Sequence, residues 1–249
     1  MIQPTHAMLL AAGLGTRMRP LTENTAKPLL PLGGKPLLDH ALDRLGAAGV
    51  GTVVVNAHWH APLVAAHLAR RERPPRTVLR EEKALLDTGG AVAAAVAEGL
   101  LGDQPFFVVN GDSFWLDGPS PALARLAAAF DPAETDAVLL VHRTFQVQSE
   151  VGFGDFLLDK RGGKWGGLRR RGEREIAPYI YAGVQILSPA LFGEGEEAVF
   201  SMNALWDRVI ESGRVRAVVH DGLWYHLSRP SDLNEAEHAL HEQLTGVTT

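Results

Sequence analysis

Apolar residues in the first 142 positions fall into two alternating patterns. Short apolar or β-branched runs predict strands of a buried parallel sheet, because such strands are covered on both faces. The amphipathic segments between them predict helices that pack on the sheet. The predicted strands are residues 6–12, 52–57, 76–80, 106–110 and 137–142. This alternation is typical of an α/β fold.

The segment between the first two predicted strands has the clearest helical pattern. Leucine and alanine recur at positions 37, 38, 41, 42 and 45, with Pro36 at the start and Gly49 just past the end. Proline is favoured at the first turn of a helix and glycine just after its end, so both residues agree with a helix here. Residues 88–101 and 120–130 also have a helical pattern.

The pattern changes after residue 143, where glycine becomes frequent. The run Lys-Arg-Gly-Gly-Lys at 160–164 separates two segments that predict hairpin strands, and residues 179–187 predict a further strand. Helical periodicity returns at 203–212 and 231–244. Because no repeat, linker or low-complexity tract interrupts the chain, we expect residues 1–249 to form a single domain with small β elaborations in the second half.

Composition narrows the possible classes of function. With 249 residues and 46% hydrophobic content, the chain can bury a large core. A formal net charge of -5 gives no overall positive field for nucleic acid, whereas a small anionic ligand needs only local positive charge. The absence of cysteine excludes disulfides, thiolate metal sites and a cysteine nucleophile. Without a signal peptide or an apolar run near the ~20 residues that span a bilayer, we expect a cytoplasmic protein with no membrane or nucleic-acid partner.

A glycine-rich turn follows the first predicted strand. In Leu-Ala-Ala-Gly-Leu-Gly-Thr-Arg, residues 10–17, Gly13 and Gly15 allow backbone amides to approach phosphate oxygens. Arg17 and Arg19 could add cationic donors, and Lys27 is close enough in the chain to reach the same phosphates. The spacing fits neither a Walker loop nor the Gly-x-Gly-x-x-Gly of dinucleotide folds, which disfavours a nicotinamide dehydrogenase. Taken alone, the turn is equally compatible with an ordinary tight turn, and Lys27 with a solvated cation.

Two further motifs lie at the predicted boundaries of strands and helices. The stretch 81–91 ends in Asp-Thr-Gly-Gly-Ala and predicts a helix start, with Thr88 as its cap and two glycines that expose backbone. The run 106–112 places the Asp112 carboxylate at the carboxyl end of a strand, where ligands of open α/β sheets bind. One carboxylate with phosphates and water suits Mg²⁺, although an aspartate in a Gly-Asp turn is commonplace.

In their fixed order these motifs resemble the sugar-1-phosphate nucleotidyltransferase family. The resemblance rests on Leu-Ala-Ala-Gly-x-Gly-Thr-Arg-x-x-Pro-Leu-Thr from residue 10, Lys-Pro at 27–28 and Gly-Lys-Pro-Leu at 34–37. It covers nearly the whole chain. It implies a Rossmann-like α/β fold of the nucleotide-diphospho-sugar transferase type, with a mixed, mostly parallel sheet flanked by helices. Residues 1–142 would then form the nucleotide-binding part and residues 143–249 the sugar-binding part.

The resemblance also implies roles for individual residues. Arg17 would stabilise the departing pyrophosphate, Lys27 would lie at the transferring phosphoryl group, and Asp112 would ligate the Mg²⁺ cofactor. Glu82 and the backbone near Asp87 would meet the pyrimidine edge. The expected nucleotide-binding residues are Leu10, Ala11, Ala12, Gly13, Gly15, Thr16, Arg17, Lys27, Glu82, Asp87, Thr88 and Gly89. The expected sugar-binding residues are Asn110, Glu150, Asp155 and Gly183.

The second metal ligand departs from the family's pattern, Trp-x-Asp-x-Gly-Thr. Here residues 224–230 are Trp-Tyr-His-Leu-Ser-Arg-Pro, so His226 stands in the ligand's place and Ser228-Arg229 replaces Gly-Thr. Imidazole is a poorer ligand than carboxylate for Mg²⁺. Three interpretations follow: weak or water-mediated ligation by His226, its replacement by another group, or an impaired site. We favour contact through water, with equal weight on a core or cap histidine that binds no ligand.

Within the family, the chain resembles in particular the N-acetylmuramate-1-phosphate uridylyltransferase branch. It shares Leu-x-Thr-Gly-Gly at 86–90, Val-Asn-Gly-Asp at 109–112 and Gly-Asp-Phe at 154–156. This implies in-line transfer of uridylate from UTP to N-acetylmuramic acid 1-phosphate in cell-wall precursor recycling, by a monomer or small homo-oligomer. The alternatives are a glucose- or mannose-1-phosphate nucleotidyltransferase and a non-catalytic nucleotide-sugar-binding regulatory protein. The arginines at 169–171 are typical of a surface face unless the sugar is acidic.

Overall fold

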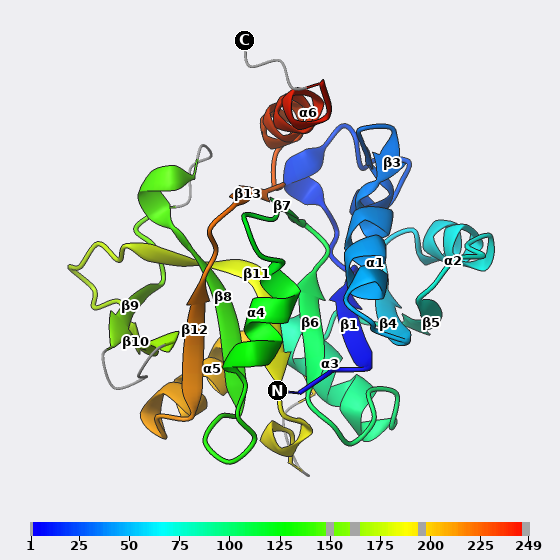
Figure 1. The fold of residues 1–249 in the computed structure, drawn as a ribbon. Coiled ribbons are helices and arrows are strands. Elements are labelled where there is room, and N and C mark those ends of the chain that lie inside the picture. The colour runs from blue at the N-terminus through cyan, green and yellow to red at the C-terminus, as the bar shows by residue number, and fades with distance from the viewer. Residues whose placement is uncertain (1, 148–151, 160–164, 194–197, 246–249) are drawn as a thin grey trace.

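The first part of the chain forms one side of a central sheet. The computed structural model describes residues 2–147, 152–159, 165–193 and 198–245. Four strands run parallel in the order β5-β4-β1-β6 (Figure 1). Their bounds are His6–Leu10 for β1, Thr52–Ala57 for β4, Arg76–Glu81 for β5 and Phe106–Asn110 for β6. The corresponding predictions are confirmed, except that β1 ends two residues early because the Ala11 N–H donates to the Asn56 side chain at 2.7 Å.

The second part of the chain extends the same sheet past β6. Strand β11 (Tyr179–Leu187) pairs antiparallel with both β6 and β8 (Ala137–Arg143). Strand β12 (Val215–Val219), outside the predicted set, lies parallel to β8. The predicted pair β9 (Phe156–Asp159) and β10 (Gly167–Arg170) is antiparallel and forms the far edge. Seven of the nine described strands therefore point one way and β10 and β11 oppose them, which makes the sheet mixed and mostly parallel, as expected.

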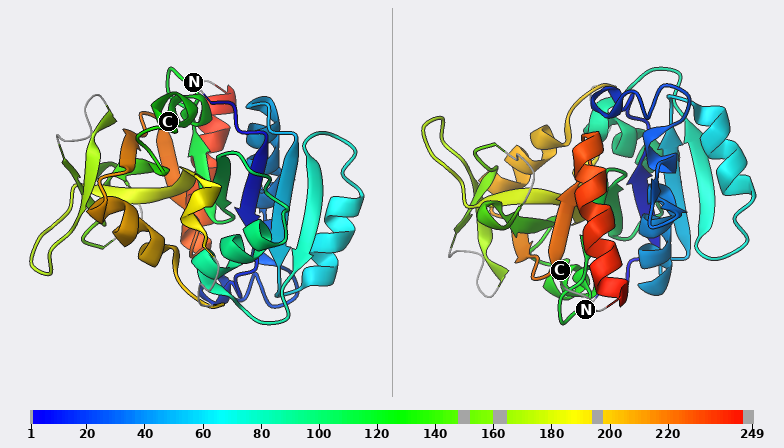
Figure 2. Two further views of the ribbon diagram at one scale, coloured as in Figure 1. Left: turned by 90° about the horizontal axis from the view of Figure 1, so that it is seen from below. Right: turned by 90° about the horizontal axis from the view of Figure 1, so that it is seen from above.

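Helices cover both faces of the sheet and one end of it. One face carries α1 (Leu37–Ala47), α2 (Ala61–Ala69) and α4 (Ala122–Ala129), and the other carries α3 (Asp87–Ala97) and α5 (Met202–Glu211). The last helix, α6 (Pro230–Thr245), lies across the end of the sheet at which β1 ends (Figures 1 and 2). All but α2 were expected from periodicity. None of the helices in the described residues combines the length and apolarity needed to cross a bilayer.

Short elements at this end of the sheet connect the two halves. Strands β7 (Ser113–Leu116) and β13 (Leu223–His226) form an antiparallel pair, and β2 (Pro31–Leu32) pairs with β3 (Lys35–Pro36). Apolar side chains of these strands form a third core with α6. Single turns of 3-10 helix occur at Thr16–Met18, Lys27–Leu29, Thr144–Gln146 and Pro189–Leu191. The β7–β13 pair brings the residues after Asp112 against those before His226, which the sequence pattern did not reveal.

Candidate active site

A pocket of about 450 Å³ opens at the carboxyl ends of the parallel strands. It is lined by residues 10–18, Lys27, Pro28, Asn56, Glu82, Leu85, Asp87, Thr88, residues 110–112 and Ser228. The structure thus brings together most of the residues expected to bind nucleotide, and Asn110 with them. Gly89, Asp155, Gly183 and His226 are not part of this lining. Glu150 lies outside the described residues.

The glycine loop is shaped for close approach of a ligand to its backbone. Gly15 has a left-handed φ of 61°, and a Cβ there would lie 3.1 Å from Thr22 Cγ2 and 3.2 Å from Lys27 Cβ. The Thr22 hydroxyl donates to the Gly15 carbonyl at 2.8 Å and fixes this turn. Around Gly13 a Cβ would meet no atom within 4 Å, so its backbone faces open space. Arg17 is exposed beside it, which gives the loop both amide donors and a nearby cation.

Lys27 and Asp112 form an ion pair in the pocket. Lys27 Nζ donates to Asp112 Oδ2 at 3.0 Å, and both side chains are largely buried. His226 Nδ1 lies 3.9 Å from the same oxygen, because the Leu227 N–H donates to the Asp112 carbonyl at 2.9 Å and aligns the two segments. The sequence therefore placed Lys27, Asp112 and His226 correctly in one neighbourhood, although their chemical roles stay predictions.

Opposing effects set the protonation of this group of side chains. Burial favours the neutral form of Asp112, but Lys27, His226 and Arg17 outweigh it and hold the pKa of the carboxyl below its usual range. Burial lowers the pKa of His226, and the opposing attraction of Asp112 is too small to reverse this. Near neutral pH Asp112 is therefore a carboxylate and His226 a neutral imidazole.

A buried polar network lies at the other end of the pocket. Asn56 Oδ1 accepts from the Ala11 N–H at 2.7 Å, and Asn56 Nδ2 donates to Glu82 Oε1 at 2.8 Å. Arg80 Nη1 lies 3.5 Å from the same Glu82 oxygen. These contacts fix the Glu82 carboxylate against the strand that leads into the glycine loop. Asn56 was not predicted, although a polar residue near the end of a buried strand was a signal for it.

The Asp-Thr-Gly-Gly segment differs from the expectation in two respects. Thr88 does not cap α3, which begins at Asp87; its hydroxyl accepts from the Met202 N–H at the start of α5, at 2.9 Å. The N–H groups of Gly89 and Gly90 both donate to the Phe200 carbonyl, at 2.9 and 3.0 Å, so they are not exposed to a ligand. Here the glycines are required because the segment before α5 packs directly on them. Asp87 and Thr88 still line the pocket.

Of the described residues expected at the sugar, Gly183 lies on β11, Asp155 contacts its start and Asn110 ends β6. Gly183 has a left-handed φ of 75°, and a Cβ there would overlap the Ser113 hydroxyl and lie 3.3 Å from Asn110 Cβ. Asp155 Oδ2 accepts from the Tyr181 N–H at 2.9 Å, so this carboxylate holds the start of β11. The structure therefore gives Gly183 and Asp155 structural contacts, while among the described members of this group only Asn110 lines the pocket.

Ser228 and Arg229 lie at the start of α6, where Asp232 holds their backbone. Asp232 Oδ2 accepts from the N–H groups of Ser228 and Arg229, at 2.8 and 2.7 Å, and lies 3.2 Å from the Ser228 hydroxyl. A carboxylate in the first turn that accepts from the residues before the helix is the geometry of a capping box. Asp232 thus holds Ser228 at the pocket wall as α6 begins.

Comparisons with known proteins agree with this geometry. A family model described as the MobA-like NTP transferase domain matches residues 7–195. The chain is 43% identical to the N-acetylmuramate alpha-1-phosphate uridylyltransferase of Caulobacter vibrioides, over 96% of this chain and 98% of that protein. It is 32% identical to the protein of the same name from Neisseria meningitidis, over 93% of this chain and 96% of that protein.

Solved structures of lower identity share the fold. A UDP-glucose pyrophosphorylase complexed with UDP-glucose matches with a TM-score of 0.78 at 18% identity, covering 98% of this chain and 100% of the other. The inositol-1-phosphate CTP transferase from T. maritima matches with a TM-score of 0.77 at 20% identity, covering 100% and 99%. The expected nucleotide-diphospho-sugar transferase fold is therefore confirmed. The chain belongs to the MobA-like NTP transferase family and is a nucleotidyltransferase.

Proposed function

We propose that this protein transfers uridylate from UTP to N-acetylmuramic acid 1-phosphate and releases pyrophosphate. The observation that carries the proposal is one continuous pocket that joins the Glu82 carboxylate, the glycine loop and the Lys27–Asp112 pair. This order matches a nucleotide with its base at Glu82 and its phosphates on the loop. The 43% identity to a uridylyltransferase over nearly both full lengths supports the choice of substrates.

The reaction needs positioned charge rather than a protein nucleophile. An oxygen of the sugar 1-phosphate attacks the α-phosphorus of UTP in line, a new P–O bond forms, and the bond to the leaving pyrophosphate breaks. Lys27 offsets charge at the α-phosphoryl group, and the exposed Arg17 reaches the departing pyrophosphate. The glycine-loop amides hold the phosphates so that attacking and leaving oxygens lie on opposite sides of phosphorus.

The residues present are compatible with Mg²⁺ delivered with the triphosphate. Among the described residues, no group of three or more His, Asp or Glu side chains forms a metal site. Mg²⁺ commonly uses one or two carboxylates and completes its shell with phosphates and water, so Asp112 alone is sufficient on the protein side. The neutral His226, 3.9 Å from Asp112, would hold such a metal through water rather than directly. When bound, the metal neutralises phosphate charge at the reaction centre.

Glu82 offers a hydrogen-bond acceptor to a pyrimidine base. A carboxylate only accepts hydrogen bonds, and one Glu82 oxygen is already used by Asn56 and Arg80. Uracil presents an N–H at its N3 position and can donate to the second oxygen, and cytosine can donate to it from its N4 amino group. The fixed carboxylate is therefore compatible with a pyrimidine base, and the choice of UTP rests on the similarity to uridylyltransferases.

A substrate panel tests the proposal. Pyrophosphate release is measured with Mg²⁺ for four nucleoside triphosphates against the 1-phosphates of N-acetylmuramic acid, N-acetylglucosamine, glucose and mannose. We expect the highest kcat/KM for UTP with N-acetylmuramic acid 1-phosphate. Turnover only with glucose or mannose 1-phosphate would contradict the acceptor while leaving the reaction class intact.

The altered C-terminal segment favours a second candidate, a nucleotide-sugar-binding regulatory protein. His226 occupies the place of the family's second acidic ligand, and Ser228-Arg229 is used to start α6. Such a protein would bind UTP or a UDP-sugar with measurable affinity yet release no pyrophosphate from any pair in the panel. A binding titration run beside the panel separates the two functions.

A further inference from the structure

The strand order locates the acceptor side of the proposed active site. The Glu82 network lies over β4 and β5, the glycine loop follows β1, and Asp112 follows β6. An in-line attack requires the acceptor to approach from the side opposite the leaving pyrophosphate. Past β6, on the side away from the glycine loop and Arg17, the next strands in the sheet are β11 and β8. Since neighbouring strands are about 4.8 Å apart, β8 lies roughly 10 Å from β6, within the span of a sugar phosphate and its substituents.

An unpaired cation ends β8 at this edge. Arg143 is the last residue of β8, which points in the same direction as β6, and it is partly buried. Within the described part of the chain, no acidic side chain forms an ion pair with Arg143 and no hydrogen bond engages its guanidinium. A partly desolvated guanidinium without a counterion is unusual, because burial of charge is costly unless it is compensated. The site is therefore suited to a negatively charged group from a ligand.

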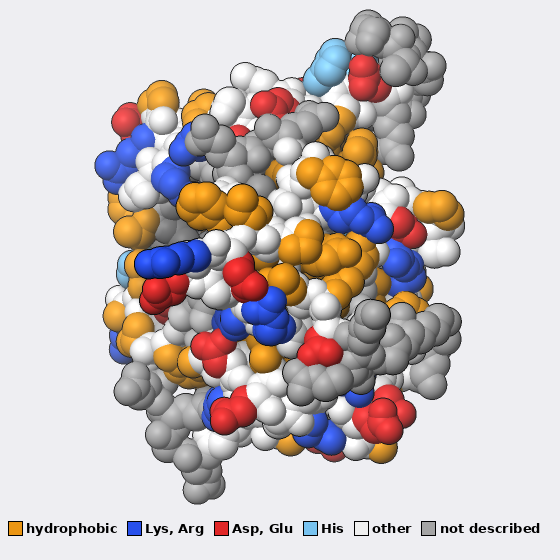
Figure 3. All heavy atoms as spheres, turned by 90° about the vertical axis from the view of Figure 1, so that its left-hand side faces the viewer, with side chains coloured by type: hydrophobic (Ala, Val, Ile, Leu, Met, Phe, Trp, Pro, Cys, Tyr) orange, Lys and Arg blue, Asp and Glu red, His pale blue; other side chains and the backbone are white. Residues whose placement is uncertain are grey.

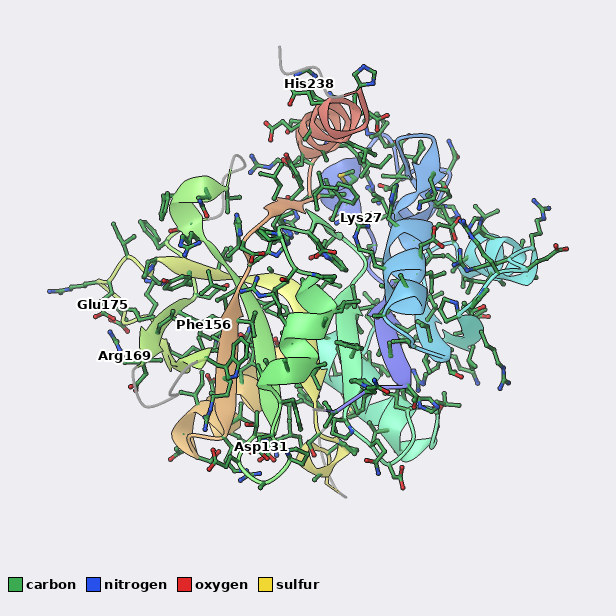
Figure 4. All side chains as sticks on the ribbon, viewed as in Figure 1. Lys27, Asp131, Phe156, Arg169, Glu175 and His238 are labelled. Carbon is green, nitrogen blue, oxygen red and sulfur yellow. The ribbon has the colours of Figure 1, made fainter. Side chains whose placement is uncertain are left out.

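Two arginines of the 169–171 run already have acidic partners. Arg169 pairs with Glu175 at 2.8 Å, and Arg170 pairs with Asp207 at 2.7 Å while stacking over Trp206. Figure 4 shows Arg169 and Glu175 at the outer edge of the sheet, far from Lys27. On the face in Figure 3, Lys and Arg side chains lie beside Asp and Glu side chains. The 169–171 run thus has surface contacts of its own, away from the pocket, whereas Arg143 ends a strand that points toward the acceptor side.

Two tyrosines of β11 share a face of the sheet with Arg143. Tyr179 is directly opposite Arg143 in the antiparallel ladder, and Tyr181 is opposite Val141. Residues opposite one another, and residues two apart on a strand, point to the same face. This face also carries α3, whose first residues Asp87 and Thr88 line the pocket.

The Tyr181 hydroxyl provides a second, independent indication of a ligand here. Its oxygen is enclosed and has no hydrogen-bond partner among the described residues. Burial and then the charge of Asp112 raise the pKa of Tyr181, so the hydroxyl stays protonated and lies within electrostatic range of the Asp112 carboxylate. A buried hydroxyl without a partner costs stability unless something fills its hydrogen-bonding capacity.

We propose that Arg143 and the Tyr181 hydroxyl, beside the Tyr179 ring, form an acceptor subsite that binds a carboxylate carried by the sugar. The inference rests on the proposed function and makes it more specific. N-acetylmuramic acid is N-acetylglucosamine with a lactyl ether at O3, so it offers one additional carboxylate. Arg143 pairs with that carboxylate, and Tyr181 donates to an oxygen of the same sugar.

Calorimetric binding of two product nucleotides tests the subsite without turnover. UDP-N-acetylmuramate and UDP-N-acetylglucosamine, which differ in the lactyl ether, are titrated into the wild type and Arg143→Gln without pyrophosphate. We expect Arg143→Gln to bind UDP-N-acetylmuramate about 10- to 100-fold more weakly, as for loss of a charge-assisted contact, with little change for UDP-N-acetylglucosamine. Arg143→Lys should retain part of the preference. Tyr181→Phe should weaken binding of both sugars.

The controls separate this inference from the proposed function. Arg174→Gln removes an exposed arginine and should bind both ligands as the wild type does. Unchanged UTP affinity in Arg143→Gln shows that the variant is folded. If Arg143→Gln keeps the wild-type preference for UDP-N-acetylmuramate, the carboxylate subsite is overturned and the transferase function stands. If the wild type binds neither nucleotide sugar and releases no pyrophosphate, the proposed function itself fails.

Discussion

At the scale of single residues, the site is organised by charges that neutralise one another before any ligand binds. Lys27 compensates Asp112 across 3.0 Å, and Asn56 with Arg80 compensates Glu82. Each pair limits the cost of holding charge in a partly buried pocket. The same charges then become available to phosphate and base, so these residues serve both the stability of the free protein and its proposed reaction.

Lys27→Ala should reduce turnover sharply. The substitution removes the cation nearest the transferring phosphoryl group, and loss of one such preorganised charge costs on the order of 100-fold or more in kcat. Pyrophosphate release from UTP and sugar 1-phosphate measures the effect. Lys83→Ala, which removes an exposed lysine outside the pocket lining, is the matched control and should turn over as the wild type does. Undiminished kcat in Lys27→Ala would exclude this role.

Glu82→Ala should act mainly on nucleotide binding. Removing the carboxylate deletes the proposed acceptor for the uracil N3–H and leaves Asn56 Nδ2 without its partner. We expect the KM for UTP to rise about 10-fold or more, with a smaller change in kcat, because the base is remote from the reacting phosphorus. Steady-state kinetics with varied UTP separates the two parameters. A UTP KM equal to that of the wild type would mean that Glu82 does not contact the base.

At the scale of elements, the helices and strands that were predicted correctly are those with a clear local sequence pattern. The elements and contacts that were not predicted depend on residues far apart in the chain. Strands such as β6 and helices such as α1 have the right periodicity within a single window. The β7–β13 pair was not predicted because each strand has four residues and its partner is more than 100 residues away. The Thr88 hydroxyl was predicted to cap its own helix, α3, but it accepts from Met202 of α5, which lies far away in the sequence. Arg143 and Tyr181 likewise become neighbours of the site only through the order of strands.

The start of α6 offers a test of an element-level contact. Asp232 accepts from the N–H groups of Ser228 and Arg229, and its replacement leaves these donors without a partner. We expect Asp232→Ala to lower the free energy of unfolding by about 1 to 2 kcal/mol, the usual range for loss of a helix cap. Urea denaturation measures the change. Asn234→Ala, at an exposed position of the same helix, should change it by less than about 0.5 kcal/mol.

At the scale of the whole molecule, one mixed sheet supports both parts of the site. The parallel strands β5, β4, β1 and β6 carry the groups proposed for base and phosphates, and β11 and β8 carry those proposed for the sugar. Because β11 lies between β6 and β8, segments from both halves of the chain are hydrogen-bonded across this edge. A change that weakens the pairing of β11 with β6 or β8 would therefore also displace the residues proposed to bind the sugar.

The global stability should fall in mild acid because of a buried histidine. Burial, with His220 and Arg143 nearby, lowers the pKa of His142 to about 4 from an ordinary 6.5. Between these pH values the unfolded chain binds a proton that the folded protein excludes. The contribution of the neutral His142 to the free energy of unfolding is therefore fully present above about pH 6.5 and is lost as the pH falls toward 4. Urea midpoints from pH 7.5 to 4.5 should fall less steeply for His142→Phe than for the wild type. Parallel pH profiles would exclude this histidine as a cause.

The central claim is that the pocket joining Glu82, Gly13 to Arg17 and the Lys27–Asp112 pair catalyses uridylyl transfer to an acidic sugar 1-phosphate. The most direct measurement follows UTP labelled at the α-phosphate, incubated with Mg²⁺, N-acetylmuramic acid 1-phosphate and the purified full chain. The account predicts that the label appears in UDP-N-acetylmuramate with one equivalent of unlabelled pyrophosphate, and that Lys27→Ala abolishes most of this transfer. Binding of UTP with the label remaining in the triphosphate would contradict it.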